Sequence, residues 1–248
     1  MIKTIKKNIN PFKSVFILGG TSEIAQEICL NLIHKGTKKI HLVSRDNKKN
    51  SSFINKITSN YDLEITHENF DLLQDDFSHI PNVGFYDLYI IAAGYLGDSI
   101  LANNDIHEAI KIAQVNYIGL IRWISAITSS ERVNHKGVMW ILTSVAGDRG
   151  RPSNYHYGAA KAALSIFCEG LLNRFYNKPF KIRIIKAGFI STKMSYLKAP
   201  KLLSVNIKYV AKTLTRRPYK EGIEYLPFWW FFVMRLIKIL PRSIVRKL

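Results

Sequence analysis

Three residues in the middle of the chain, Ser144, Tyr157 and Lys161, have the types and the spacing needed to exchange a proton with a substrate oxygen. Tyr157 and Lys161 are four positions apart, so on a helix they lie on one face. An ammonium beside a phenol favours the phenolate, and we expect it to lower the tyrosine pKa from its ordinary value of about 10. Such a tyrosine can act as acid or base near neutral pH. Ser144, 13 positions before Tyr157, can hydrogen-bond the same oxygen.

Other reactive side chains near this set are interpreted as structural. Tyr155 has no lysine four positions later, which makes it a weak rival as the acid, and His156 is interpreted as orienting or exposed. Cys29 and Cys168 are the two cysteines, and they lie far apart inside helix-like patterns. They predict neither a disulfide nor a metal cluster, so no metal site is predicted and a reducing compartment is expected.

An alternating pattern of short β-branched runs and helix-like stretches must position these residues. The chain has 248 residues, 47% of them hydrophobic, which suits one α/β domain with a sizeable core. Strands are expected at 14–18, 39–44, 63–70, 87–92, 138–143, 181–186 and 223–226, and helices at 22–35, 105–129, 157–176 and 207–216. This order predicts a single Rossmann-like α/β domain over residues 1–227, with a doubly wound parallel sheet and helices on both of its faces.

Neither a signal peptide nor a membrane-spanning helix is predicted. The basic N-terminal segment precedes only a short apolar run that flows into a glycine turn. The longest uncharged apolar stretch, residues 225–234, is well short of the roughly 20 residues that span a bilayer.

The turn after the first expected strand is rich in glycine. It contains Gly19, Gly20, Thr21, Ser22, Glu23, Ile24 and Ala25, in that order. A glycine turn between a strand and a helix lets the backbone approach a diphosphate, which then lies at the helix N-terminus. The same turn is common as a purely structural feature, and Ala25 stands where a third glycine is usual. Taken alone, the turn therefore leaves cofactor binding open.

The ends of the second and third strands bear on the type of cofactor. Arg45, which follows Ser44, stands where an acid would hydrogen-bond the adenosine ribose of NAD. An arginine there can neutralise the 2′-phosphate of NADP instead, although a solvated loop charge is the alternative. Asp71 is placed to bind an adenine edge, with a role in a turn as its alternative. The pattern favours NADP(H) over NAD(H).

Together these motifs resemble the short-chain dehydrogenase/reductase family over residues 14–227. Residues 19–25 resemble its cofactor loop, 92–94 the segment after its fourth strand, and 186–192 its nicotinamide-side loop. Asn116 matches the helix asparagine of the family, and Ser144, Tyr157 and Lys161 match its active site. The sequence departs from the family pattern at Glu23, Ala25, Ala92 and Ala187.

The resemblance implies a role for each matching residue. Tyr157 would be the acid/base, Ser144 would orient the substrate, and Asn116 would hold a water in a proton relay to Lys161. Lys161 would also bind the nicotinamide ribose, the Ile190 backbone would meet the carboxamide, and Thr192 would lie near the phosphates. The implied cofactor-binding residues are Gly19, Thr21, Ser22, Glu23, Ile24, Ser44, Arg45, Asp71, Ala92, Ala93, Gly94, Tyr157, Lys161, Ile190 and Thr192.

Within the family, the sequence is similar to the subgroup that reduces decaprenylphosphoryl 2-keto-pentose in cell-wall arabinan synthesis. The likeness lies in residues 18–24, 94–98 and 144–149 and in a basic, aromatic C-terminus. It implies a lipid-linked keto sugar as the substrate. The segment 194–205 is the expected lid over that substrate, and its Lys198 and Lys201 would meet a phosphate or be solvated.

Positive charge is concentrated in the last quarter of the chain. Residues 181–248 contain 16 Lys and Arg but two acids, whereas the first 180 residues contain 20 and 16. In the tail, residues 228–248, a helix is expected with an apolar face of Trp229, Val233, Leu236, Ile237 and Leu240 and a basic face of Arg235, Lys238 and Arg242. Such a helix suits the headgroup region of an anionic membrane. The alternative is packing on its own domain or on a second copy, which leaves a homo-oligomer open.

These patterns lead to one hypothesis and two alternatives. The hypothesis is a cytoplasmic NAD(P)H-dependent oxidoreductase of a ketone or secondary alcohol, working at a membrane surface on a lipid-linked sugar. The alternatives are a reductase of an unrelated soluble ketone, with the tail used for dimerisation, and a cofactor-sensing binding protein without turnover. Nucleic acid is not expected as a partner, because the aromatics cluster in one apolar run instead of spreading along a basic groove.

Overall fold

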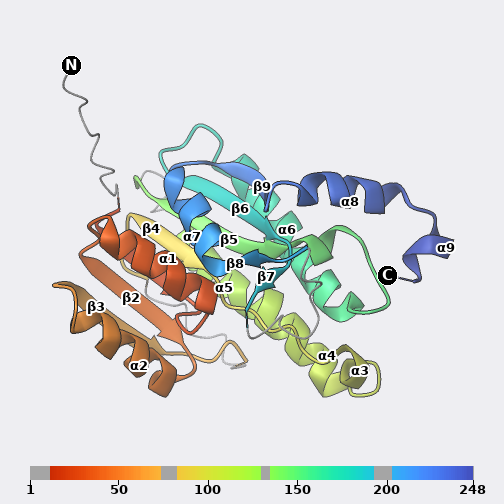
Figure 1. The fold of residues 1–248 in the computed structure, drawn as a ribbon, viewed down its shortest axis with the longest axis horizontal. Helices are drawn as coiled ribbons and strands as arrows, with labels where there is room; N and C mark the ends of the chain where they lie inside the picture. The colour runs from red at the N-terminus through yellow and green to blue at the C-terminus, as the bar shows by residue number, and fades with distance from the viewer. Residues whose placement is uncertain (1–11, 74–82, 130–134, 193–202, 248) are drawn as a thin grey trace.

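A seven-stranded parallel sheet forms the centre of the structure, a computed structural model that describes residues 12–73, 83–129, 135–192 and 203–247 (Figure 1). The strand order is β3-β2-β1-β4-β5-β6-β9, and each neighbouring pair is parallel. The strands are β1 (Ser14–Leu18), β2 (Lys39–Ser44), β3 (Glu64–Asn69), β4 (Leu88–Ile91), β5 (Val138–Ser144), β6 (Lys181–Ala187) and β9 (Gly222–Leu226). A separate parallel pair is formed by β7 (Ile190–Ser191) and β8 (Val205–Asn206).

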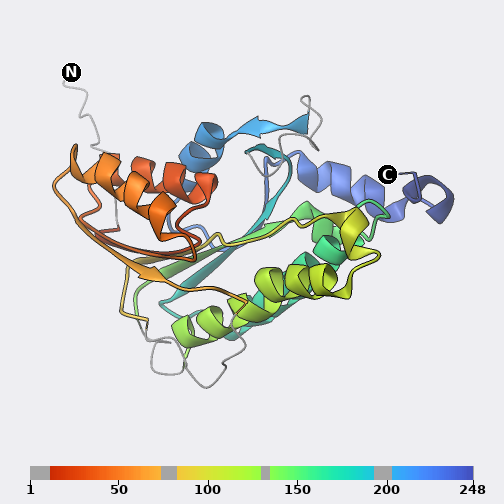
Figure 2. The same cartoon turned by 90° about the horizontal axis from the view of Figure 1, so that it is seen from below.

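Helices cover both faces of this sheet, as the sequence predicted (Figure 2). One face carries α1 (Glu23–His34), α2 (Asn47–Thr58) and α7 (Ile207–Arg216), and the other carries α4 (Ile106–Ala113), α5 (Gly119–Ile127) and α6 (Tyr155–Arg174). The short helix α3 (Ser99–Ala102) precedes α4, and α8 (Trp230–Ile239) and α9 (Arg242–Val245) follow β9. The Rossmann-like doubly wound α/β fold is confirmed.

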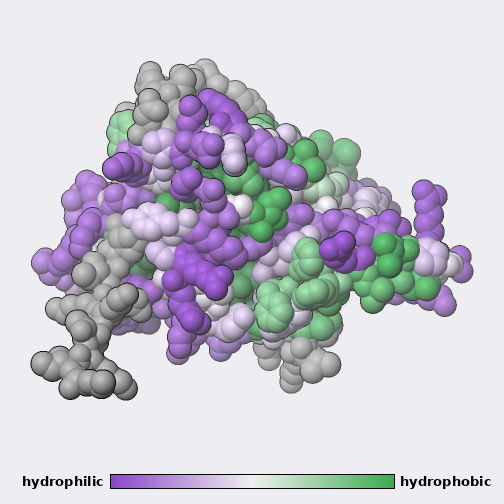
Figure 3. Space-filling model, turned by 90° about the horizontal axis from the view of Figure 1, so that it is seen from above, coloured by the Kyte–Doolittle hydropathy of each residue, from purple (hydrophilic) through white to green (hydrophobic). Residues whose placement is uncertain are grey.

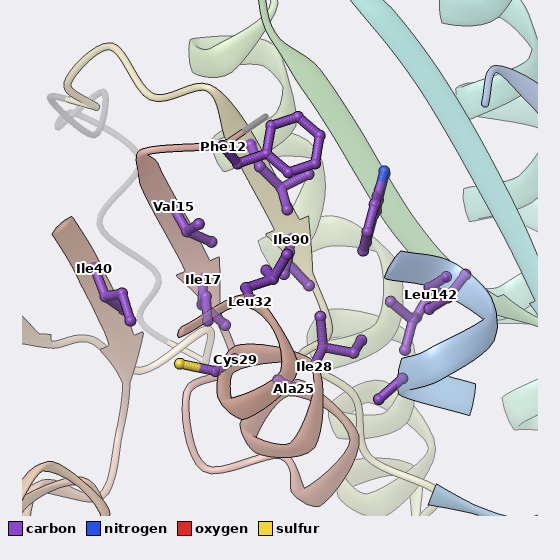
Figure 4. Close-up of a cluster of buried hydrophobic side chains, with 14 of the residues drawn as sticks. Phe12, Val15, Ile17, Ala25, Ile28, Cys29, Leu32, Ile40, Ile90 and Leu142 are labelled. Atoms are coloured by element: carbon purple, nitrogen blue, oxygen red, sulfur yellow. The ribbon is translucent and has the colours of Figure 1, made fainter. Parts of the chain in front are cut away.

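Alternation along the strands divides the core into two hydrophobic layers. Val15 and Ile17 of β1 face α1, where Ala25, Ile28 and Leu32 recur at helical spacing and are buried (Figure 4). Phe16 and Leu18 point to the opposite layer, which packs on α5 and α6. Both cysteines are free and buried, in agreement with their structural interpretation.

The helices differ from the expectation in several places. The predicted helix over 105–129 is interrupted by a π-helical turn, Gln114–Ile118, between α4 and α5. The helix α6 begins at Tyr155, two residues before the predicted start. The helices α2 and α3 were not predicted, because α2 carries few apolar residues and α3 is a single turn.

The strand order places the candidate residues at one edge of the sheet. In open parallel sheets, ligands bind outside the carboxyl ends of the strands, where the direction of the crossovers reverses. That point lies between β1 and β4. Of the expected lid over 194–205, the structure describes residues 203–205, and Lys198 and Lys201 lie outside the described residues.

Candidate active site

Ser144 is the last residue of β5 and leads into a short 3-10 helix, Val145–Asp148. Its Oγ accepts a hydrogen bond from the Ala146 N–H at 3.1 Å and donates to the Ala187 carbonyl at 3.4 Å. The hydroxyl is therefore held at the point where the ends of β5 and β6 meet.

Two glycines bring the segment after Ser144 onto α6. A Cβ on Gly147 would lie 2.8 Å from the carbonyl carbon of Lys161, and a Cβ on Gly158 would lie 2.9 Å from the Ala146 carbonyl oxygen. Only residues without side chains allow this approach. The 3-10 helix consequently packs directly on the turn of α6 that carries the tyrosine and the lysine.

Tyr157 and Lys161 share one face of α6, as their spacing predicted. The Lys161 Nζ lies 5.8 Å from the centre of the Tyr157 ring. Lys161 is 3% exposed, and Tyr157 is partly buried. The structure thus brings the two side chains together in an environment largely without water.

Burial dominates the electrostatics of this pair. It raises the pKa of Tyr157 to about 12, and the hydrogen bond with Ser144 opposes this rise. Burial lowers the pKa of Lys161 to about 8, against the opposing influence of Cys168. The expected lowering of the tyrosine pKa is therefore wrong for this structure, because the loss of water around the phenol outweighs the hydrogen bond with Ser144. Tyr157 keeps its proton at neutral pH, while Lys161 can change charge near pH 8.

Asn116 lies in the π-helical turn and is fully buried. Its Oδ1 accepts from the Tyr95 N–H at 3.1 Å, and its Nδ2 donates to the carbonyls of Tyr95 at 2.6 Å and Ile112 at 2.8 Å. A Cβ on Gly94 would lie 3.2 Å from the Asn116 Oδ1 and 3.4 Å from the Lys161 Nζ. Asn116 therefore fixes the backbone beside Lys161, and its relay role stays a prediction.

The glycine turn lies against the end of β4. Gly19 has φ +95°, and a Cβ there would lie 2.5 Å from the Ala93 nitrogen. The N–H groups of Gly19 and Gly20 donate to the Val43 carbonyl at 2.8 and 3.1 Å. Ser22 caps α1 by accepting from the Ala25 N–H at 3.5 Å. The partly exposed residues at this helix N-terminus and at the end of β4 are Thr21, Ser22, Glu23, Ile24, Ala92, Ala93 and Gly94.

The ends of β2 and β3 lie farther out in the sheet. Arg45 is exposed, whereas Ser44 is buried and its Oγ accepts from the Asn50 Nδ2 at 2.7 Å. The Asp71 Oδ1 accepts from the Leu73 N–H at 3.1 Å, which is the turn role weighed from the sequence. These residues do not join the catalytic cluster, and their expected role at the adenosine end of a cofactor stays a prediction.

Residues of the β6 side complete the predicted set. Ile190 is buried in β7, and Thr192 follows it, partly exposed. Both belong to the segment that follows Ala187, the residue of β6 that pairs with Ser144.

Asp148 joins four elements, a role that sequence reasoning missed. Its buried carboxylate accepts from the Lys186 Nζ of β6 at 2.6 Å and from the Tyr225 hydroxyl of β9 at 2.6 Å, and it lies 3.7 Å from the Lys238 Nζ of α8. Burial, together with this carboxylate, raises the Tyr225 pKa. No spacing rule links residues from four separate elements, so only their proximity to Ser144 in the fold reveals the network.

The tail helix packs on this region with a face that matches the expected one only in part. Trp230 and Met234, which were not on the predicted apolar face, are buried and cluster with Val145 and Phe189. Of the predicted face, Trp229, Val233 and Ile237 pack against this cluster, whereas Leu236 is 58% exposed. The predicted apolar face was therefore wrong in part, since α8 is apolar on nearly all sides and periodicity does not decide which side packs. No helix in the described ranges is long and apolar enough to cross a bilayer.

The residues at the strand ends fit a dinucleotide. Gly19 and Gly20 place no side chain directly after β1, and Thr21 and Ser22 then lead into the N-terminus of α1, where a diphosphate is favoured. Beside it, the buried Asn50 Oδ1 has no hydrogen-bond partner and would lie 3.1 Å from a Cβ on Gly20. Lys161 and Tyr157 lie on the other side of Gly94 from the glycine turn, at the same carboxyl end of the sheet.

Comparison with known proteins agrees with this geometry. The model of the short chain dehydrogenase family matches residues 13–201. An uncharacterized oxidoreductase of Streptomyces coelicolor is 26% identical, with 96% of each chain covered. A short chain dehydrogenase from Burkholderia cenocepacia, solved with NADP, has a TM-score of 0.70 at 15% identity and covers 92% of this chain and 98% of its own.

A 3-oxoacyl-[acyl-carrier protein] reductase from Brucella melitensis, solved with NAD, has a TM-score of 0.68 at 17% identity and covers 85% and 87%. These two structural likenesses show the fold, while the family match and the related oxidoreductase carry the assignment. The chain therefore belongs to the short-chain dehydrogenase/reductase family and is an NAD(P)-dependent oxidoreductase.

Proposed function

We propose that the protein transfers hydride between NADP(H) and a ketone or secondary alcohol, with Tyr157 as the acid/base. The observation that carries the proposal is the meeting of Ser144, Tyr157 and Lys161 beside the Gly19 turn. When bound, the cofactor supplies the hydride for the carbonyl carbon. Tyr157 gives its proton to the carbonyl oxygen, Ser144 hydrogen-bonds that oxygen, and Lys161 returns a proton to Tyr157.

The charge states of the two residues suit the reducing direction. Tyr157, with a pKa of about 12, is protonated throughout the neutral range, so the proton that a ketone needs is present. Lys161, with a pKa of about 8, can release and regain a proton near physiological pH. Asn116 would hold the water that connects Lys161 to solvent.

The test is NADPH oxidation with a panel of ketones, in wild type and Tyr157→Phe. We expect a loss of at least about 100-fold, the scale of general acid catalysis. Tyr155→Phe is the matched control, because Tyr155 is 47% exposed and donates to the Asn103 Oδ1 instead. Equal rates for wild type and Tyr157→Phe would remove the assignment. NADPH binding without turnover of any ketone would favour the cofactor-sensing alternative.

NADP(H) is proposed as the preferred cofactor because the exposed Arg45 follows the buried end of β2. A charge-assisted contact with a 2′-phosphate is worth about 1.5–3 kcal/mol, so Arg45→Ala is expected to lower the NADPH-to-NADH ratio of kcat/KM by about tenfold or more. The exposed neighbour Lys48→Ala serves as the control. An unchanged ratio for Arg45→Ala would leave no basis for the preference.

The proposed substrate is a polyprenyl-phosphate-linked keto sugar of cell-envelope polysaccharide synthesis. Two features support it: the similarity of residues 144–149 to the subgroup that acts on such a substrate, and the apolar surface of the C-terminal helices. In the space-filling view, hydrophobic and hydrophilic side chains alternate toward the end of the molecule that carries these helices (Figure 3). The competing reductase of a soluble ketone would use this surface for dimerisation instead.

An anionic membrane surface is the proposed partner of the exposed side of the tail. Its apolar members, each at least 58% exposed, are Phe228, Phe232, Leu236 and Ile239. The cations Arg235 of α8 and Arg242 of α9 are exposed, as are Arg246 and Lys247, which follow α9. Aromatic and basic side chains together suit the headgroup region of an anionic bilayer.

Vesicle co-sedimentation tests the membrane proposal. The protein should bind phosphatidylglycerol vesicles at low salt, bind phosphatidylcholine vesicles less, and lose binding in the double variant Phe232→Ala/Ile239→Ala. Absence of binding to anionic vesicles at low salt would overturn it. A dimer that depends on Phe232 and Ile239 would assign the same surface to a second copy instead.

A further inference from the structure

The C-terminal helix α8 contacts both segments that border the catalytic residues. Trp230 is 2% exposed and Met234 is 1% exposed, and both pack on Val145, the residue after Ser144. The same cluster includes Phe189, the residue before Ile190. One helix therefore spans the ends of β5 and β6, where the proposed substrate and nicotinamide contacts lie.

The closest of these contacts is between Trp230 and Gly188. A Cβ on Gly188 would lie 2.0 Å from the Trp230 Nε1, so the indole packs directly on the loop backbone. The Nε1 itself is buried without a hydrogen-bond partner. An unpaired buried donor is destabilising, and the packing of this large ring must offset that loss. The indole therefore fixes the position of the loop after β6 by direct contact with its backbone.

The other end of α8 is held by polar contacts. Lys238 lies 3.7 Å from the buried carboxylate of Asp148. Arg149 donates to the carbonyls of Lys238 at 3.3 Å and Leu240 at 3.4 Å, the last carbonyls of the helix. These contacts tie α8 to the 3-10 helix after Ser144, whose Gly147 packs on the backbone of Lys161.

We propose that α8 is a positioning element of the active site, with Trp230 setting the loop 187–190 and Lys238 and Arg149 setting the segment 144–148. This inference rests on the proposed function, since it assigns a catalytic consequence to these contacts. It goes beyond membrane docking, because it concerns the buried side of the helix and predicts effects in solution, without lipid. The helix would then join the proposed membrane surface on one side to the catalytic residues on the other.

The test compares two aromatic truncations in solution with NADPH and a water-soluble ketone. Displacement of reacting groups by about 1 Å costs on the order of 100-fold, so Trp230→Ala should raise the KM for NADPH and lower kcat by about tenfold or more. Trp230→Phe, which keeps a ring, should recover part of this loss. Tyr176→Ala removes an aromatic that is 72% exposed and outside the site, and it should leave both constants within about twofold.

Hydrogen–deuterium exchange gives a second readout that does not need turnover. In Trp230→Ala, but not in Tyr176→Ala, the amides of 144–148 and 187–190 should exchange faster while the amides of β1 and β2 stay protected. Lys238→Gln should accelerate exchange in 144–148 alone, and Lys212→Gln, on the exposed side of α7, should not. If Trp230→Ala proves too unstable to purify, Trp230→Phe and Lys238→Gln carry the test.

The results separate the two proposals. If the wild type turns over a ketone, and if Trp230→Phe and Lys238→Gln have the same kinetic constants and exchange rates as the wild type, the positioning role is overturned and the reductase function stands. No turnover of any ketone in wild type, together with faster exchange at 144–148 and 187–190 in the variants, would remove the reductase function while retaining the structural coupling.

Discussion

The Lys161 Nζ lies 5.8 Å from the centre of the Tyr157 ring, one helical turn farther along α6, and the same burial shifts the pKa values of the two groups in opposite directions. Loss of water disfavours the charged form of each group, so the phenol holds its proton more tightly and the amine more weakly. The pair is therefore arranged with a stable proton on Tyr157 and a labile one on Lys161.

The first prediction concerns the pH dependence of ketone reduction. Lys161 is charged below its pKa of about 8 and neutral above it, whereas Tyr157, at about 12, does not titrate in the same range. The kcat/KM for NADPH reports groups of the free enzyme, and it should fall as pH rises through about 8. Initial rates between pH 6 and pH 10 measure this limb. A flat profile across pH 8 would contradict the assignment of Lys161.

The second prediction is that Lys161→Met inactivates the enzyme but stabilises it. The unfolded lysine binds its proton up to about 10.5 and the folded one only to about 8, so between these values wild-type stability rises with pH. At pH 7 the buried charge of Lys161 lowers the free energy of unfolding by about 3 kcal/mol, and a Met side chain at this position would not cause this loss. Urea denaturation should show this gain at pH 7 and its decline toward pH 10.5. Lys212→Met, on an exposed side chain, is the control, and destabilisation by Lys161→Met at pH 7 would be the contrary result.

Local patterns made the sheet and the catalytic triplet predictable. The separation of Tyr157 and Lys161 by four residues fixes their shared face wherever α6 lies, and the β-branched runs identify all seven strands of the sheet. The tyrosine pKa was predicted in the wrong direction, because burial depends on elements distant in sequence. The Asp148 network was missed for the same reason, since Lys186, Tyr225 and Lys238 reach it from three other elements.

The third prediction compares Gly19 of the glycine turn with Gly36, which follows α1, in order to separate backbone strain from steric clash. Gly19 and Gly36 have similar positive φ values, +95° and +102°, but a Cβ at Gly19 would meet the Ala93 backbone at 2.5 Å, whereas at Gly36 the nearest atom is the Lys13 Nζ at 4.0 Å. Gly36→Ala should therefore cost only the backbone strain, about 1–2 kcal/mol. Gly19→Ala should cost more and should also weaken NADPH binding, because the turn must move away from β4. Thermal denaturation and NADPH fluorescence titration measure the two effects, and equal behaviour of the variants would argue against a tight turn.

The fourth prediction concerns Arg183, which is 1% exposed in β6. Its Nη1 donates to the carbonyls of Leu214 at 2.9 Å and Arg217 at 3.0 Å, at the end of α7, and its Nε pairs with Glu224 of β9. Arg183→Met would leave a carboxylate and two carbonyls without this partner, so we expect a loss of about 3–5 kcal/mol.

The matched control for that variant is Lys181→Met on the same strand. Lys181 pairs with Glu221 at 2.7 Å, but the two side chains are 32% and 47% exposed. Water and salt therefore screen the pair, and its loss should cost less than about 1 kcal/mol. Urea denaturation of the two variants at pH 7 gives the comparison. If both variants lose a similar free energy of unfolding, the contacts of Arg183 with α7 and β9 do not contribute to stability as proposed.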